Sequence, residues 1–316
     1  MKKIISKQIV FFGGKGGVGK STSSSAYALT TARKGQKTLL VSTDPAHNLG
    51  DIFHVKLSGK PIALTDHLWG IEIDPDEESK RYLTGVKKNL KGLVKPKMIE
   101  EVHRQIDLAG SSPGADEAAM FDRIVSIILD EKDSFDLIVF DTAPTGHTIR
   151  LLTLPELMGA WIDGMLKRRE SMNENYSSWM GDGEPVEDPI YDILEKRKER
   201  FANVRKVLLD PSQTEYVFVL NPERLPILET EKAIQTLEKH DLNVRTIVVN
   251  KLLPNEETGS FFQKRKEQER EYVAWINQTF DQQEKIYLPL LDGDVSTMDA
   301  LEEVSKNMQK ELYFQS

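Results

Sequence analysis

Ten residues near the start of the chain, GGKGGVGKST from Gly13 to Thr22, have the composition and spacing of a phosphate-binding loop. They follow a short apolar run, Ile9–Phe12, and precede a segment able to form a helix, which is the context such a loop requires. Glycines let successive backbone N–H groups surround phosphate oxygens, Lys20 reaches the β- and γ-phosphates, and the Ser21 hydroxyl binds Mg²⁺. The alternative, a glycine-rich turn without a ligand, matches less of the pattern. The residues expected to bind the nucleotide are Gly14, Lys15, Gly16, Gly17, Val18, Gly19, Lys20, Ser21 and Thr22.

Lys15 is a second lysine inside this loop, where an ordinary phosphate loop needs none. A cation at this position could bind a phosphate held by a partner subunit. Taken alone, the side chain could equally be solvated.

Two aspartates follow predicted strands, at the sheet edge where α/β proteins bind ligands. Asp44 comes after the apolar segment Lys37–Ser42 and could orient or deprotonate an attacking water, although Asp44-Pro45 could also be only a turn. Asp141 ends the apolar run Phe135–Phe140, the pattern by which P-loop enzymes hold Mg²⁺, often through water. The small residues of 142–148 could then contact the γ-phosphate and move when it leaves.

The elements that must position these residues alternate along most of the chain, as apolar strands and amphipathic helices. This predicts an α/β fold of the P-loop NTPase type, with a doubly wound, mainly parallel sheet and a helical insertion. The expected strands are 9–12, 37–42, 69–74, 135–141, 216–220, 244–250 and 285–288. The expected helices are 21–33, 76–91, 99–109, 113–128, 189–209, 230–240, 260–280 and 298–310.

Residues 154–184 differ in composition from the rest, with four of the nine methionines and two of the four tryptophans. Met158, Met165 and Met172 are spaced by seven, so they could share one helix face. Methionine suits surfaces that adapt to varied apolar partners, but such a stripe can equally pack against its own core. We expect one domain over 1–316 with a helical insertion at about 154–209.

Composition excludes several functions. The net charge of −8 disfavours a protein whose main task is to neutralise nucleic-acid phosphates or anionic lipid. The absence of cysteine excludes disulfides, thiolate metal sites and iron–sulfur clusters. No signal peptide, membrane span or membrane anchor is visible, so we expect a cytoplasmic location. Residues 311–316 resemble the remnant of a cleaved affinity tag and are left out of the functional argument.

Five segments of the chain form a combined pattern: GKGGVGKST (Gly14–Thr22), STDPAHNLGDIF (Ser42–Phe53), DTAPTGHT (Asp141–Thr148), VVNK (Val248–Lys251) and LPLL (Leu288–Leu291). Together they resemble the ArsA family, which includes arsenite-pump ATPases and the ATPase that targets tail-anchored membrane proteins. The resemblance spans nearly the whole chain. His47 lies in the family's first switch segment and His147 in its second.

The resemblance implies a homodimer that holds two ATP molecules between its subunits, with Lys15 reaching the partner's nucleotide. Asp44 falls on the catalytic aspartate of the family. The resemblance therefore implies that Asp44, Lys20 and Lys15 are catalytic. Ser21 and Asp141 would hold the metal.

The resemblance also implies the sites for the base and for a client protein. Glu223 and Asn250 match family contacts to the base and ribose, and Pro289 and Leu290 match the loop that flanks adenine. Residues 154–184 align with the helical subdomain that binds apolar clients.

Two departures from the family pattern bear on function. The eukaryotic targeting ATPases bind zinc through a CxxC pair, where this chain has Gln263 and Lys266. Arsenite-pump members bind As(III) through cysteine thiolates, which this chain cannot supply. We therefore expect ATP and Mg²⁺ as cofactors, without zinc or an iron–sulfur cluster.

These observations leave two functional hypotheses. The first is an ATPase that captures and delivers apolar membrane-protein segments, with a membrane receptor as a possible further partner. The second is the energising subunit of an arsenite or other anion efflux pump. A third class, the partitioning and division-site ATPases, would need a basic DNA-binding face or a basic membrane-binding tail, and neither is visible in the sequence.

Overall fold

The computed structural model describes residues 3–44, 48–89, 99–110, 114–143, 146, 149–150, 152–154, 156, 158–159, 162–168, 170, 189–254 and 260–313. The chain forms two compact units. The first unit combines Met1–Asp74, Glu131–Arg150 and Leu208–Ser316, and the second combines Pro75–Asp130 and Leu151–Val207.

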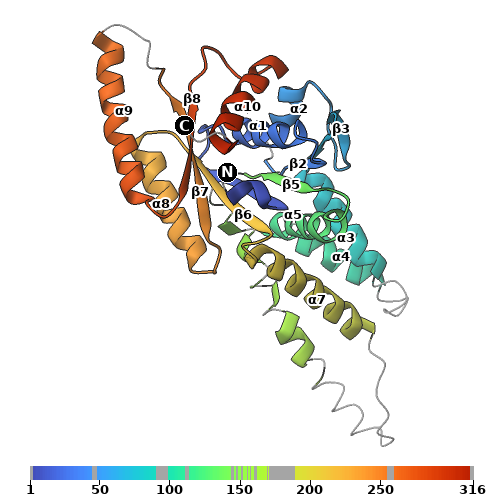
Figure 1. Ribbon diagram of the computed structural model, residues 1–316. Helices are drawn as coiled ribbons and strands as arrows, with labels where there is room; N and C mark the ends of the chain where they lie inside the picture. Colours follow the sequence, from blue (N-terminus) through green and yellow to red (C-terminus); the bar gives the residue numbers. More distant parts are fainter. Residues whose placement is uncertain are drawn as a thin grey trace, which may run out of the picture. The chain divides into compact units, whose positions relative to one another are not determined.

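The first unit is built on an eight-stranded sheet with the order β3-β4-β2-β5-β1-β6-β7-β8 (Figure 1). Only β3 and β4 pair antiparallel, and the other neighbours are parallel. This confirms the expected α/β fold with a mainly parallel sheet. The strands are β1 (Ile9–Gly14), β2 (Thr38–Ser42), β3 (Ile62–Thr65), β4 (Leu68–Glu72), β5 (Leu137–Asp141), β6 (Thr214–Leu220), β7 (Val244–Leu252) and β8 (Glu284–Pro289).

The central strands are buried along their whole length. Every residue of β1, β2, β5 and β6 is buried. Parallel strands with both faces covered need apolar side chains in both directions, which explains why apolar residues dominate these sequences on both faces. Phe11 of β1 stacks on Phe140 of β5 and on Tyr216 of β6, with ring centroids 4.5 and 5.5 Å apart.

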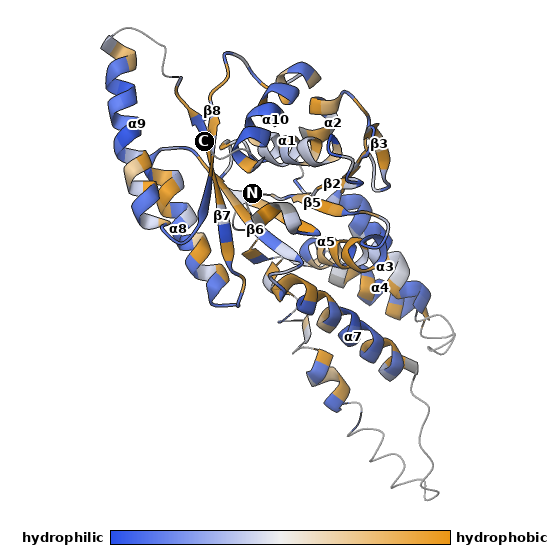
Figure 2. Cartoon of the chain, viewed as in Figure 1, coloured by the Kyte–Doolittle hydropathy of each residue, from blue (hydrophilic) through white to orange (hydrophobic). Residues whose placement is uncertain are grey.

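Helices α1 (Lys20–Ala32), α2 (Asn48–Phe53) and α10 (Met298–Tyr313) form one group of packed helices, and α8 (Arg224–Glu238) and α9 (Ser260–Thr279) form another. Helix α1 is pale in Figure 2 because small polar residues dominate it. Apart from Ser21 and Thr22, every residue of this helix is buried. Thr30 of α1 and Ser305 of α10 bring their hydroxyl oxygens within 2.9 Å, and Arg33 forms an ion pair with Glu302. The last helix thus supports the helix that follows the phosphate loop.

Helix α10 extends beyond its expected end at residue 310. The Glu311 carboxylate accepts a hydrogen bond of 3.2 Å from the backbone N–H of Tyr287 in β8. Leu312 is buried in the core, and the Lys34 ammonium lies 3.4 Å from the centroid of the Tyr313 ring. These three residues of the tag-like segment therefore pack as part of the first unit.

The second unit contains helices α3 (Pro75–Asn89), α4 (Ile99–Gly110), α5 (Ala115–Ser126) and most of α7 (Pro189–Leu209). Arg197 of α7 donates a hydrogen bond of 3.0 Å to Asp122, and its guanidinium lies 4.8 Å from the centroid of the Tyr82 ring. A π-helical segment, Ile127–Glu131, follows α5. The expected insertion at 154–209 falls mainly in this unit, which also includes the helices of 75–130.

The methionine-rich segment is described only in part. Met158 and Met165 are half-buried, whereas Ile162 and Leu166 beside them are buried. Trp161, Met172, Trp179 and Met180, which belong to the predicted apolar face or lie near it, are outside the described residues. Among the helices that the structure describes, none is both long and apolar enough to cross a bilayer.

Candidate active site

The phosphate loop lies between β1 and α1, as the sequence predicted. Gly17 and Gly19 have φ angles of 81° and 90°, in the left-handed region that suits glycine. The loop is held from the end of β7. Asn250 Nδ2 donates a hydrogen bond of 2.8 Å to the Val18 carbonyl, and Lys251 Nζ donates one of 3.0 Å to the Gly17 carbonyl. Two loop carbonyls are thereby bonded to β7, and the loop conformation depends on a distant strand.

A cavity of about 580 Å³ opens over the loop. Asp44, two residues after the end of β2, lines the same cavity, so the structure brings together predicted phosphate-binding residues and the predicted catalytic aspartate. Asp51, Ile52, Val295 and Ser296 form the remaining wall. The loop residues that line the cavity are Gly16, Gly17, Gly19, Lys20, Ser21 and Thr22.

Lys20 is buried at the base of this cavity. Its ammonium donates a hydrogen bond of 3.2 Å to the Lys15 carbonyl. Burial lowers the pKa of Lys20, while the carboxylates of Asp141 and Asp44 raise it. A buried ammonium at the edge of this cavity can donate charge-assisted hydrogen bonds to a phosphate group.

Asp141, at the end of β5, is fully buried. Burial raises the pKa of its carboxyl to about 7, while the nearby Ser21 hydroxyl and the Lys20 ammonium lower it. Neither carboxylate oxygen has a partner among the described residues that meets both the distance and the angle expected of a hydrogen bond. A buried carboxylate without such bonds is destabilising unless a cation approaches it. Asp141 and the Ser21 hydroxyl therefore fit Mg²⁺, which prefers oxygen ligands and retains water.

Asp44 is half-buried, and its backbone N–H donates a hydrogen bond of 3.3 Å to the Ser42 hydroxyl. The adjacent Thr43 N–H bonds the Asp141 carbonyl at 2.9 Å, which ties the ends of β2 and β5 together. The switch residues His47 and His147 are outside the described part of the chain.

The Lys15 side chain pairs with a residue of helix α8. Its ammonium forms an ion pair of 2.9 Å with Glu229 of α8, and both side chains are well exposed, at 36% and 46%. An exposed ion pair contributes little stability, about 0–1 kcal/mol. Lys15 can therefore leave Glu229 for a stronger anion at small cost.

The four residues expected to contact the base and ribose of the nucleotide, Glu223, Asn250, Pro289 and Leu290, do not all line one pocket. Glu223 and Leu290 line one pocket of about 220 Å³, together with Lys251. Asn250 is buried and bonds the phosphate loop, and Pro289 lines an adjoining groove under α9, which shares Leu253 and Glu269 with that pocket.

Sequence reasoning did not select three residues that the structure places at the site. Lys251 follows the buried part of β7, and its position in the VVNK segment was the available signal. Asp51 and Ser296 line the phosphate cavity from α2 and from the loop after β8. Asp51 lies in the STDPAHNLGDIF segment, which was the available signal, whereas no local pattern marks Ser296.

Comparison with known proteins agrees with this geometry. A family model described as an anion-transporting ATPase matches residues 7–310. The chain belongs to the ArsA ATPase family. It is an ATP-hydrolysing enzyme of that family.

Three members of the family illustrate the similarity. A protein named arsenical pump-driving ATPase 2 in Aquifex aeolicus is 35% identical over 300 residues, covering 95% of this chain and 98% of that protein. The ATPase GET3 of Candida glabrata is 34% identical, covering 96% of this chain and 89% of that protein. The ATPase ASNA1 homolog 2 of Paramecium tetraurelia is 31% identical, covering 95% and 93%.

Gly19→Ala tests the constraint on the loop. A Cβ at Gly19 would overlap the Asn250 side-chain amide, and φ at this position is 90°. We expect a loss of about 1–3 kcal/mol in the free energy of unfolding and at least about tenfold weaker ATP binding, because the loop amides would move. Chemical denaturation and calorimetric titration would measure the two effects.

Gly16→Ala is the matched control for stability, since a Cβ there would have no protein atom within 4 Å. Its free energy of unfolding should stay within about 0.5 kcal/mol of the parent. A Gly19→Ala protein that unfolds and binds ATP like the parent would contradict the role given to the Asn250 contact.

Proposed function

We propose that this protein is a homodimeric, Mg²⁺-dependent ATPase whose nucleotide-driven closing and opening captures and delivers apolar segments of membrane proteins. The buried, unbonded carboxylate of Asp141 beside Lys20 is the observation that carries the Mg²⁺-dependent ATPase. The exposure of Lys15 supports the proposal of a dimer. The half-buried methionines Met158 and Met165 of the second unit support the proposal that apolar segments bind there.

The reaction is transfer of the γ-phosphoryl group to water. The inward N–H groups of the loop and the Lys20 ammonium would bind the phosphates and offset the charge that develops on them. Asp44 would orient the attacking water and accept its proton, since it lines the cavity together with Lys20. Mg²⁺ on Asp141 and the Ser21 hydroxyl would supply further charge stabilisation.

The nucleotide base would bind in the pocket that Glu223 and Leu290 line. Glu223 and Leu290 share one pocket, and Asn250 and Pro289 lie at the ends of the neighbouring strands β7 and β8. The Asn221 side-chain oxygen in this pocket is buried and lacks a hydrogen-bond partner among the described residues. A buried acceptor of this kind suits an amino group or hydroxyl of a nucleoside.

Dimerisation gives Lys15 its proposed role. Among the described residues, the Lys15 ammonium pairs with Glu229, whose side chain is exposed. A partner subunit's γ-phosphate would be a stronger anion, so ATP would favour the closed dimer through a contact that exists only there. Hydrolysis removes that contact and allows the helical surfaces to rearrange.

The anion pump is the second candidate function. The description of the family model and the name of the Aquifex relative favour it. The absence of cysteine disfavours an arsenite site, because As(III) prefers soft thiolate ligands. We therefore expect the steady-state ATPase rate to stay within about twofold when arsenite or antimonite is added. Stimulation by either anion would favour the pump.

Mixed dimers test whether Lys15 acts across the subunit interface. Lys15→Ala homodimers and Asp44→Asn homodimers should each retain less than about 1% of the parent turnover. In a heterodimer of the two, one site keeps its own Asp44 and receives Lys15 from the partner. That site should restore up to about half of the parent turnover.

Two different affinity tags would allow the heterodimer to be purified before ATP hydrolysis is measured. Each homodimer, purified in the same way, is the control. An inactive heterodimer of confirmed composition would argue that Lys15 acts within its own chain.

Two neighbouring substitutions test the client surface. Met165 is half-buried and Ile162 is fully buried on the same helical segment. Met165→Asp should abolish capture of an apolar helical peptide while ATPase activity and melting temperature stay close to those of the parent. Ile162→Asp should instead destabilise the unit by several kcal/mol, about 3 or more, because it buries an unpaired carboxylate.

Pull-down of a transmembrane peptide, with thermal unfolding of each variant, would separate these effects. A Met165→Asp protein that stays folded and still captures the peptide would exclude this face from client binding. One that unfolds like Ile162→Asp would assign Met165 to the core.

A further inference from the structure

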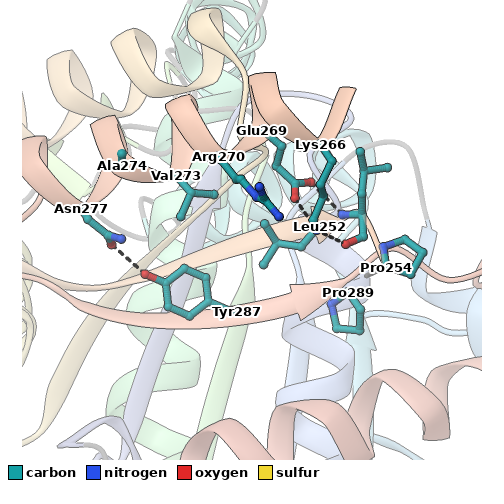
Figure 3. A pocket seen from close by; sticks show the side chains of 11 residues that line it. Leu252, Pro254, Lys266, Glu269, Arg270, Val273, Ala274, Asn277, Tyr287 and Pro289 are labelled. Atoms are coloured by element: carbon teal, nitrogen blue, oxygen red, sulfur yellow. Dashed lines mark hydrogen bonds and ion pairs between the residues drawn. The ribbon is translucent and has the colours of Figure 1, made fainter. Parts of the chain in front are cut away.

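A groove of about 610 Å³ lies between α9 and the ends of β7 and β8, on the first unit (Figure 3). Apolar atoms of Leu252, Pro254, Val273, Tyr287 and Pro289 form much of its wall. The groove shares no lining residue with the phosphate cavity. Its volume lies in the range of small-molecule sites, about 300–1,000 Å³.

Most polar groups in the groove are already bonded to one another. The buried Glu269 carboxylate accepts a hydrogen bond of 2.7 Å from the Leu253 N–H and pairs with Lys266 at 2.8 Å. The Lys266 ammonium also donates to the Leu253 carbonyl. The Tyr287 hydroxyl lies 2.7 Å from Asn277 Oδ1 and donates to it. These contacts fix the groove walls and leave Lys266 and Glu269 electrically compensated.

Arg270 is the exception among the described residues that line the groove. Its guanidinium has no ion pair and no hydrogen bond in the described structure, and it reaches from α9 toward β7, over Leu252 (Figure 3). An exposed arginine by itself is only a solvated charge. Here the charge overhangs an apolar hollow of molecular size, and it gives the groove an uncompensated positive charge.

We propose that this groove binds a small organic anion with an apolar, flat body. The acid group would pair with the Arg270 guanidinium, whose planar donors match carboxylate and sulfonate oxygens. The body would lie on Val273, Leu252 and the ring of Tyr287. The apolar wall disfavours a fully hydrated ion such as inorganic phosphate, since such an ion would lose water without gaining contacts there.

Two dyes of nearly equal shape test the proposal on the full-length, nucleotide-free protein. 1-Anilinonaphthalene-8-sulfonate carries the acid group, and N-phenyl-1-naphthylamine lacks it. We expect saturable binding of the sulfonate and at least about tenfold weaker binding of the neutral dye, because the charge-assisted hydrogen bonds are lost. Arg270→Gln should remove this preference, whereas Arg270→Lys should retain part of it.

Arg265→Gln is the matched control, because Arg265 lies on the same helix but lines the smaller pocket beside Glu223. It should leave the affinity for the sulfonate within about twofold of the parent. Thermal unfolding would verify that each variant is folded. The proposal is overturned if Arg270→Gln binds the sulfonate as the parent does, if Arg265→Gln loses the binding instead, or if ADP displaces the dye equally from the parent and from Arg270→Gln.

Discussion

The buried carboxylate of Asp141 is the constraint on which the nucleotide site depends. Parallel strands end at a common edge, and at that edge β5 places an acid among apolar strands, beside Lys20. Water cannot solvate this carboxylate, and the protein gives its oxygens no hydrogen bond of full geometry. The Lys20 ammonium offsets the charge only in part, since the pKa of the Asp141 carboxyl is still raised to about 7. A further cation would therefore stabilise the carboxylate.

The phosphate loop depends in a similar way on residues far along the chain. Its glycines allow the curled conformation, but they do not select it, because glycine is free in the unfolded chain as well. Selection comes from Asn250 and Lys251, which bond two loop carbonyls. Lys251 itself has a φ of 58°, which is uncommon for a residue with a side chain. The end of β7 thus adopts an unusual conformation to fix the loop.

The sequence was sufficient to predict the elements whose signals are local. The apolar run before Asp141 and the glycine loop before α1 each carry their own signal within a dozen residues. Strand β3 was missed because it has four residues, is only partly buried and pairs antiparallel through a tight turn at His67. Helix α8 begins at Arg224, six residues before its expected start. Pro226 is tolerated there because the first N–H groups of a helix need no partner within it.

The site was less predictable than the fold, for a physical reason. Phosphate-binding groups are contiguous, so spacing alone reveals them. Ser296 and Glu229 reach the loop region only through tertiary folding, and their surroundings have no signature in the sequence. The same holds for Leu312, which is buried although its local sequence resembles a tag remnant.

The packing of α10 on α1 has a consequence for biosynthesis. Thr30 and Ser305 are separated by 275 residues, yet they meet in the buried interface between the two helices. A ribosome adds residues in order, and contacts between distant segments form only after the later segment has emerged. Helix α1 of the nascent chain must therefore wait, with the face that α10 covers still exposed, until the ribosome has added the residues of α10, 275 positions later.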